Sequence, residues 1–71
     1  MKPDESALWD AMLAALPGRA MPRDIANSLG IHPKRACGLF QKWADRGLYD
    51  YGVVVDGGWL TPEGIAFGRS R

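Results

Sequence analysis

Basic and amide side chains gather in one short stretch of this chain, the segment PKRACGLFQKW at residues 33–43. It carries Lys34, Arg35, Gln41 and Lys42, whose ammonium, guanidinium and amide groups donate hydrogen bonds. Arginine and lysine donate to phosphate oxygens or to O6 and N7 of guanine, and glutamine pairs with an adenine edge. The residue types and their spacing therefore indicate a surface that recognises a polyanion.

Each of the other polar or small residues in this region has more than one interpretation. His32 either contacts a phosphate or caps a helix, and Cys37 is either a redox sensor or a plain small residue. Gly38 lies inside a helical segment, where glycine costs about 1 kcal/mol relative to alanine. Its presence indicates close approach by a DNA backbone, a partner helix or the chain's own hairpin. Lys34 and Arg35 are either ligand contacts or a solvated helix start, although positive charge there opposes the helix dipole.

Catalytic and metal-binding chemistry has little support in the residue types. Asp24, Asp45 and Glu63 are not paired as acid and base, and the single histidine lies at a loop corner, so no Ser-His-Asp arrangement is expected. Cys37 is the single cysteine, which excludes an internal disulfide and a structural zinc site. We therefore predict that this is not an enzyme and that it has no catalytic residue, metal or cofactor.

Length and charge limit the class of protein. With 71 residues, the chain forms one small domain over residues 1–71, and 46% hydrophobic residues make a packed core plausible without a metal or disulfide. The net charge is only +1, but acids lie near the start and in residues 48–61, while bases lie in the middle and at the tail. A one-sided basic face is therefore expected.

The chain's amino-terminal residues and hydropathy suggest where it acts. The segment MKPDESALWD has acids where a secretory signal needs an apolar run, and no apolar segment approaches the length of a membrane span. We expect a cytoplasmic protein, associated with the nucleoid when bound, and no membrane partner.

Two helices are predicted before residue 31. The first is capped by Asp4 or Ser6, presents an apolar stripe and stops at PGR, residues 17–19. The stripe consists of Leu8, Met12, Ala15 and Leu16. The second runs from Pro22 to Gly30 with an inward face made of Ile25, Ala26 and Leu29. Between them, Ala20 and Met21 could add an edge to a sheet.

A third helix is predicted over residues 33–46. Pro33 suits its first turn, and Gly47 suits its carboxyl-terminal cap. Helical spacing places four apolar residues on its buried side: Ala36, Leu39, Phe40 and Trp43.

The last third of the chain predicts a hairpin and a helical turn. LYDYGVVVDGGWLT at 48–61 alternates like two strands, with a two-residue turn at DG or GG within 56–58. The inward face would hold Tyr51, Val53, Val55 and Leu60, with Trp59 pointing outward opposite Val54 or Asp56. Thr61 would then cap a helical turn from Pro62, and residues 68–71 would form a flexible end.

Three segments, taken with their order and spacing along the chain, resemble the winged helix-turn-helix superfamily, in the manner of small bacterial and phage transcription regulators. They are RDIANSLGI, KRACGLFQKWADRGL and WLTPEG, and the resemblance covers roughly residues 6–67. It implies an α+β, mainly α fold: a three-helix core, a short carboxyl-terminal β-hairpin called the wing, and a final helical turn.

The resemblance also implies a function. The helix over residues 33–46 would be the recognition helix that enters the major groove of double-stranded DNA, in a sequence-specific regulator of transcription or of another DNA transaction. Because one such helix offers few base contacts, we expect a homodimer or a cooperative partner. Arg23, which opens the preceding helix, would contact a phosphate. The implied DNA-binding residues are Arg23, His32, Lys34, Arg35, Cys37, Gly38, Gln41 and Lys42.

The wing departs from the pattern of the superfamily. DNA-binding wings usually carry arginine or lysine at the tip, whereas this one offers Asp56, Gly57 and Gly58. Val54 and Trp59 are expected to be exposed, and aromatic surface of that kind marks protein interfaces. The alternative function is therefore a protein–protein interaction module that uses the hairpin face around Trp59, with a second copy or another protein as partner.

Overall fold

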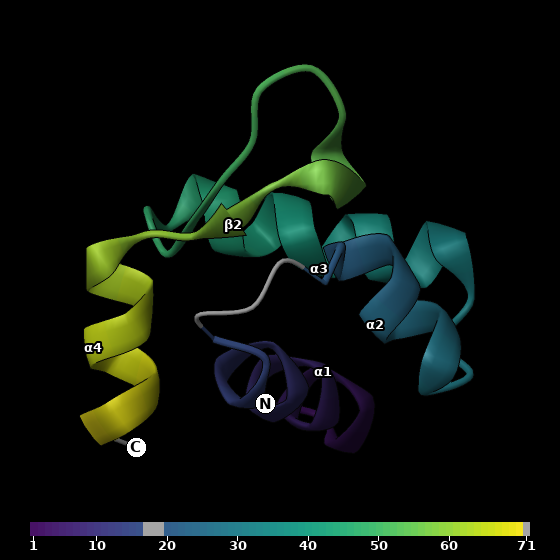
Figure 1. The fold of residues 1–71 in the computed structure, drawn as a ribbon, viewed down its shortest axis with the longest axis horizontal. Helices are drawn as coiled ribbons and strands as arrows, with labels where there is room; N and C mark the ends of the chain where they lie inside the picture. The colour runs from purple at the N-terminus through teal and green to yellow at the C-terminus, as the bar shows by residue number, and fades with distance from the viewer. Residues whose placement is uncertain (17–19, 71) are drawn as a thin grey trace.

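The computed structural model describes residues 1–16 and 20–70, which fold into four α-helices and a two-stranded antiparallel sheet (Figure 1). The elements in order are α1 (Pro3–Ala14), α2 (Pro22–Ser28), α3 (Pro33–Asp45), β1 (Tyr49–Asp50), a 3-10 turn (Val55–Gly57), β2 (Trp59–Leu60) and α4 (Pro62–Ser70). The predicted α+β, mainly α class is confirmed. No helix in this described part is long and apolar enough to cross a bilayer.

The core lies between α1, α3 and the sheet. The predicted buried side of α3 is confirmed, because Ala36, Leu39, Phe40 and Trp43 are all buried. The rings of Trp9 and Trp43 meet edge to face with centroids 4.7 Å apart, and Phe40 stacks on Tyr49 at 5.0 Å. Large aromatic side chains supply much of the apolar area that a domain of this size can bury. These contacts hold α3 by one side and leave its other side outward.

Glycines end α2 and α3 in the same way. Gly30 and Gly47 have φ of +73° and +75°, in the left-handed region that favours glycine. Past α2, the Ile31 amide donates to the Ala26 carbonyl at 3.0 Å; past α3, the Leu48 amide donates to the Trp43 carbonyl at 2.9 Å. Such turns satisfy carbonyls that a helix end leaves free. They confirm the predicted turn at Gly30 and the predicted cap at Gly47.

The bounds of both helices before the turn differ from those expected. Neither Asp4 nor Ser6 caps α1, because the helix already begins at Pro3 with Lys2 as its N-cap. α1 ends at Ala14, so Leu16 does not continue the buried stripe and is 39% exposed. The predicted stop at residues 17–19 lies outside the described residues. In α2, Leu29 falls on the C-cap and is exposed, so its predicted inward position was wrong.

The predicted tight hairpin was also wrong. Tyr49 pairs with Leu60 and Asp50 with Trp59, and residues 51–58 form a loop that projects at the top of Figure 1, on the side away from α1. The sheet contains only β1 and β2 among the described residues, so Ala20 and Met21 add no edge to it.

The Tyr49 hydroxyl explains the shape of this loop. It donates to the Val55 carbonyl at 2.6 Å and accepts from the Gly58 amide at 2.9 Å. The loop is thereby folded around a buried ring instead of being paired along a ladder. Burial raises the pKa of the Tyr49 phenol to about 12, although the bond from Gly58 acts in the opposite direction.

The loop changes which side chains point inward. Leu60 is buried as predicted, Tyr51 and Val55 are half-buried, and Val53 is 98% exposed, so its inward prediction was wrong. Val54 and Trp59 are exposed, as expected. The cross-strand neighbour of Trp59 is Asp50, however, and not Val54 or Asp56.

The last helix is longer than the predicted single turn. Thr61 does cap it: its Oγ1 accepts from the Gly64 amide at 3.0 Å and donates to the Gly47 carbonyl at 2.7 Å. α4 then continues to Ser70, so residues 68–70 are helical and not a loose end. A Cβ at Gly68 would collide with Leu13 and with the Trp9 indole nitrogen, because α4 lies close against α1 there.

Candidate nucleic-acid interface

The side of α3 that faces away from the core is uncovered. Lys34, Gly38 and Gln41 are exposed and follow one another at steps of four and three residues, which places them on one face of the helix. A Cβ built at Gly38 would meet no atom within 4 Å. The chain's own hairpin therefore does not approach Gly38, and that explanation for the glycine was wrong. Cys37, beside this face, is half-buried.

The amino-terminal end of α3 is fixed by His32. Its Nδ1 accepts a hydrogen bond from the Lys34 amide at 3.1 Å, so the histidine is the helix cap. The Lys34 side chain makes no ion pair with any residue that the structure describes. Its ammonium remains the accessible positive charge at this end of the face.

Arg35 is held by an acid from α1. Its Nε donates to Asp4 Oδ2 at 2.7 Å and its Nη2 donates to Asp4 Oδ1 at 3.0 Å. The Arg35 guanidinium lowers the pKa of the Asp4 carboxyl to about 2, and the same contact raises the pKa of Arg35. Arg35 is therefore paired within the chain, which offsets its charge at the positive end of the helix dipole, and its predicted contact with DNA stays a prediction.

Lys42 points toward a buried carboxylate. Its Nζ donates to Glu5 Oε1 at 3.1 Å, while Glu5 Oε2 accepts from the Trp43 indole nitrogen at 2.8 Å. Glu5 is only 2% exposed. Burial pushes the pKa of Glu5 upward, but the bonds from Trp43 and Lys42 outweigh this and the pKa is lowered. Lys42 thus has a partner within the chain while its side chain stays 52% exposed, and its predicted contact with DNA stays a prediction.

Arg23 and Gln41 also have partners within the chain. Arg23 Nε lies 3.5 Å from Asp56 Oδ2, so the acidic tip of the 51–58 loop pairs with the residue we expected on a phosphate. Gln41 donates to Asp45 at 3.0 Å and accepts from the Tyr51 hydroxyl at 3.0 Å. Both side chains are exposed, and their predicted contacts with DNA stay predictions.

Sequence reasoning missed the two acids that organise this region, Asp4 and Glu5. A usable signal existed for Glu5, which precedes Leu8, Trp9 and Met12 by three, four and seven residues and so extends the buried stripe. A carboxylate on a buried face needs donors, and the neighbouring helix supplies them. No comparable pattern pairs Asp4 with Arg35, because the two residues meet only in the folded chain.

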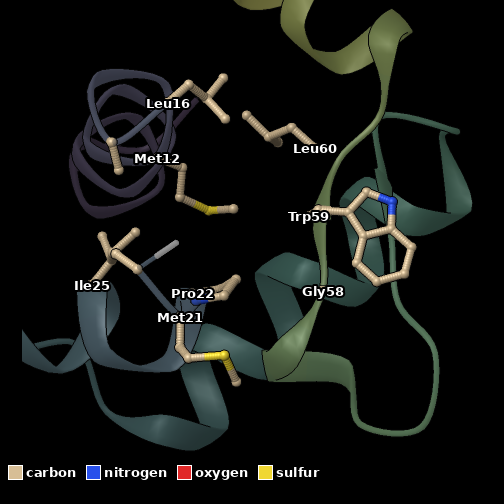
Figure 2. A pocket seen from close by; sticks show the side chains of 10 residues that line it. Met12, Leu16, Met21, Pro22, Ile25, Gly58, Trp59 and Leu60 are labelled. Atoms are coloured by element: carbon tan, nitrogen blue, oxygen red, sulfur yellow. The ribbon is translucent and has the colours of Figure 1, made fainter. Parts of the chain in front are cut away.

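A second accessible surface lies around β2. Trp59 and Val54 are about half exposed, and a cavity of about 230 Å³ opens between α1, α2 and β2. Figure 2 shows the side chains of Met12 and Leu60 directed at this cavity, whereas the Trp59 ring points away from it on the other side of the strand. The surface is apolar but its two parts face different directions.

The search for a metal site and the comparison with known proteins assign no role to either surface. Within residues 1–16 and 20–70, no group of three or more histidine, cysteine, aspartate or glutamate side chains could hold a metal ion. Comparison with family models, with curated proteins and with solved structures found no match to this chain.

Proposed function

We propose that this chain binds double-stranded DNA through the exposed face of α3, as a small sequence-specific regulator of transcription. The observation that carries the proposal is that Lys34 and Gly38 on this face are exposed and that no described residue covers Gly38, although the opposite side of the helix is fully packed. A helix held by one side can enter a major groove about 12 Å wide. Lys34 lies at the leading end, and Gly38 lets a backbone approach closely.

The ion pairs of Arg23 and Arg35 are compatible with this proposal. Both arginines are more than 40% exposed, and the single 3.5 Å contact of Arg23 with Asp56 is a weak ion pair because water and salt screen it. A phosphate can replace Asp56 beside Arg23 without leaving a buried charge unpaired. Because one α3 offers few base contacts, we propose that two copies bind repeated half-sites.

The proposal is tested by fluorescence anisotropy with mixed-sequence duplexes at low salt. Wild type should bind at micromolar protein or below, with affinity that falls steeply as salt rises. Lys34→Gln should weaken binding and lower the salt slope by about 0.9, because one phosphate contact is lost. Arg69→Gln, the matched loss of one charge on α4, should change neither. Absence of binding by wild type at low salt, or equal effects of the two variants, would overturn the proposal.

A second candidate function is protein binding through the surface around Trp59. It is favoured by the exposure of Val53, Val54 and Trp59 in one segment, since large exposed apolar side chains are common at interfaces. Under this alternative, Trp59→Ala should abolish the regulatory activity of the protein and its dimer formation measured by analytical ultracentrifugation. The double variant Lys34→Ala with Arg35→Ala should spare both. If DNA binding is the main function, the double variant should abolish regulatory activity and Trp59→Ala should spare it.

A further inference from the structure

Arg35 is bonded to Asp4 in a way that leaves one of its two donor edges open. The guanidinium carries five N–H donors in a rigid plane. Asp4 takes the edge made by Nε and Nη2, at 2.7 and 3.0 Å. The edge made by Nη1 and the second hydrogen of Nη2 is not used by this contact. That edge can donate two parallel hydrogen bonds to one further group.

The carboxylate that holds Arg35 is itself fixed to the backbone. Asp4 Oδ1 also accepts from the Glu5 amide at 2.8 Å. Glu5 in turn joins α1 to α3 through the buried bond from Trp43 at 2.8 Å. The core therefore fixes the Glu5 backbone, the Glu5 amide orients the Asp4 carboxylate, and that carboxylate orients the Arg35 guanidinium. A long flexible side chain is held in one orientation before any ligand arrives.

The charge of the pair indicates which ligand the open edge suits. Asp4 and Arg35 together have no net charge, so an anion gains little attraction from the pair. The two remaining N–H donors stay parallel, and two parallel donors match a neutral pair of adjacent acceptor atoms. In duplex DNA that pair is O6 and N7 of guanine, the commonest bidentate partner of arginine.

We infer that Asp4 is a positioning residue that orients Arg35 to read a guanine in the major groove. The inference deepens the proposed function and rests on it, since it requires α3 to bind DNA. Asp4 contributes to specificity by limiting the orientations of Arg35. It does not supply affinity, because its charge repels phosphates.

The experiment is a base-substitution series on the duplex that wild type selects from a randomised pool. Wild type should prefer guanine at one position by about tenfold or more over the other bases, the size expected of a bidentate contact. Arg35→Lys should abolish that preference while keeping a positive charge. Asp4→Asn should reduce it to about twofold, although it removes a negative charge near the DNA. Asp10→Asn, which removes the same charge from the same helix, should leave it unchanged.

A double-variant cycle separates orientation from charge. If Asp4 acts through Arg35, Asp4→Asn should change guanine preference in wild type but not in Arg35→Lys, whereas a general charge effect would be the same in both. Circular dichroism of each variant checks that the fold is retained.

Failure of this inference differs from failure of the proposed function. If wild type binds no duplex, the proposed function fails and the inference fails with it. If wild type binds but Asp4→Asn keeps the full guanine preference, with or without tighter binding of every duplex, or loses affinity equally for all bases, the inference alone is overturned. The first result would make Asp4 a neutral or masking residue, and the second would place Arg35 on a phosphate.

Discussion

Two sides of α3 differ in how the rest of the chain uses them. On the side that faces α1, Arg35, Lys42 and the Trp43 indole each donate to a carboxylate from the first turn of α1. On the outward side, Lys34 and Gly38 contact no such partner among the described residues, and a Cβ at Gly38 would meet open space. Folding therefore constrains the first side, leaving one donor edge of Arg35 open, and it places no such constraint on Lys34 and Gly38 on the second side.

The largest effect that would separate the two sides is expected from Glu5→Ala. It removes the acceptor of the buried Trp43 indole, and an orphaned buried donor costs about 1–3 kcal/mol. In a domain of this size, each kcal/mol lowers Tm by about 4–8 °C, measured by thermal circular dichroism. Glu5→Gln keeps an acceptor oxygen and should lose less. Equal losses in the two variants would contradict a role for this hydrogen bond.

A smaller effect of opposite sign is expected from Gly38→Ala on the outward side. The new methyl meets nothing in the chain, and alanine is favoured over glycine inside a helix by about 0.5–1 kcal/mol. The variant should therefore raise Tm and the urea midpoint of unfolding. The same variant should weaken DNA binding if a DNA backbone approaches this position. A lower Tm would mean that the fold itself requires glycine at position 38, and the difference between the two sides of α3 would then not hold.

The smallest effect on stability is expected from Asp4. Folding lowers the pKa of this carboxyl from 3.8 to about 2, so its contribution is complete above about pH 4 and is lost as pH falls toward 2. Asp4→Asn should remove that part of the acid dependence of Tm, with little change in Tm at pH 7 because the pair is exposed. A loss at pH 7 as large as that of Glu5→Ala would mean that the pair holds α1 to α3.

The helical half of the chain was largely predictable because its signals are local. Proline at the starts of α2 and α3, glycine at their ends, and apolar residues at helical spacing each act through neighbours in sequence. The partners of the cations were not predictable in the same way. Asp4 meets Arg35 across 31 residues and Glu5 meets Lys42 across 37, so their pairing depends on how α1 packs against α3.

The hairpin was predicted as an element but not in its register. Alternation correctly indicated two paired strands, but the predicted two-residue turn at DG or GG was wrong, and the alternation of Tyr51, Val53 and Val55 suggested a longer ladder than exists. The Tyr49 hydroxyl, bonded to two loop residues, competes with that ladder and shortens it. Bonding of a side-chain hydroxyl to the loop backbone cannot be predicted from the hydropathy pattern of the sequence.

The three tryptophans have an optical consequence. Trp9 and Trp43 are fully buried and in contact with each other, whereas Trp59 is 53% exposed on β2. Iodide in solution would quench the emission of Trp59 and leave that of the other two largely intact. Fluorescence recorded with and without iodide therefore reports separately on β2 and on the interior, with no added dye.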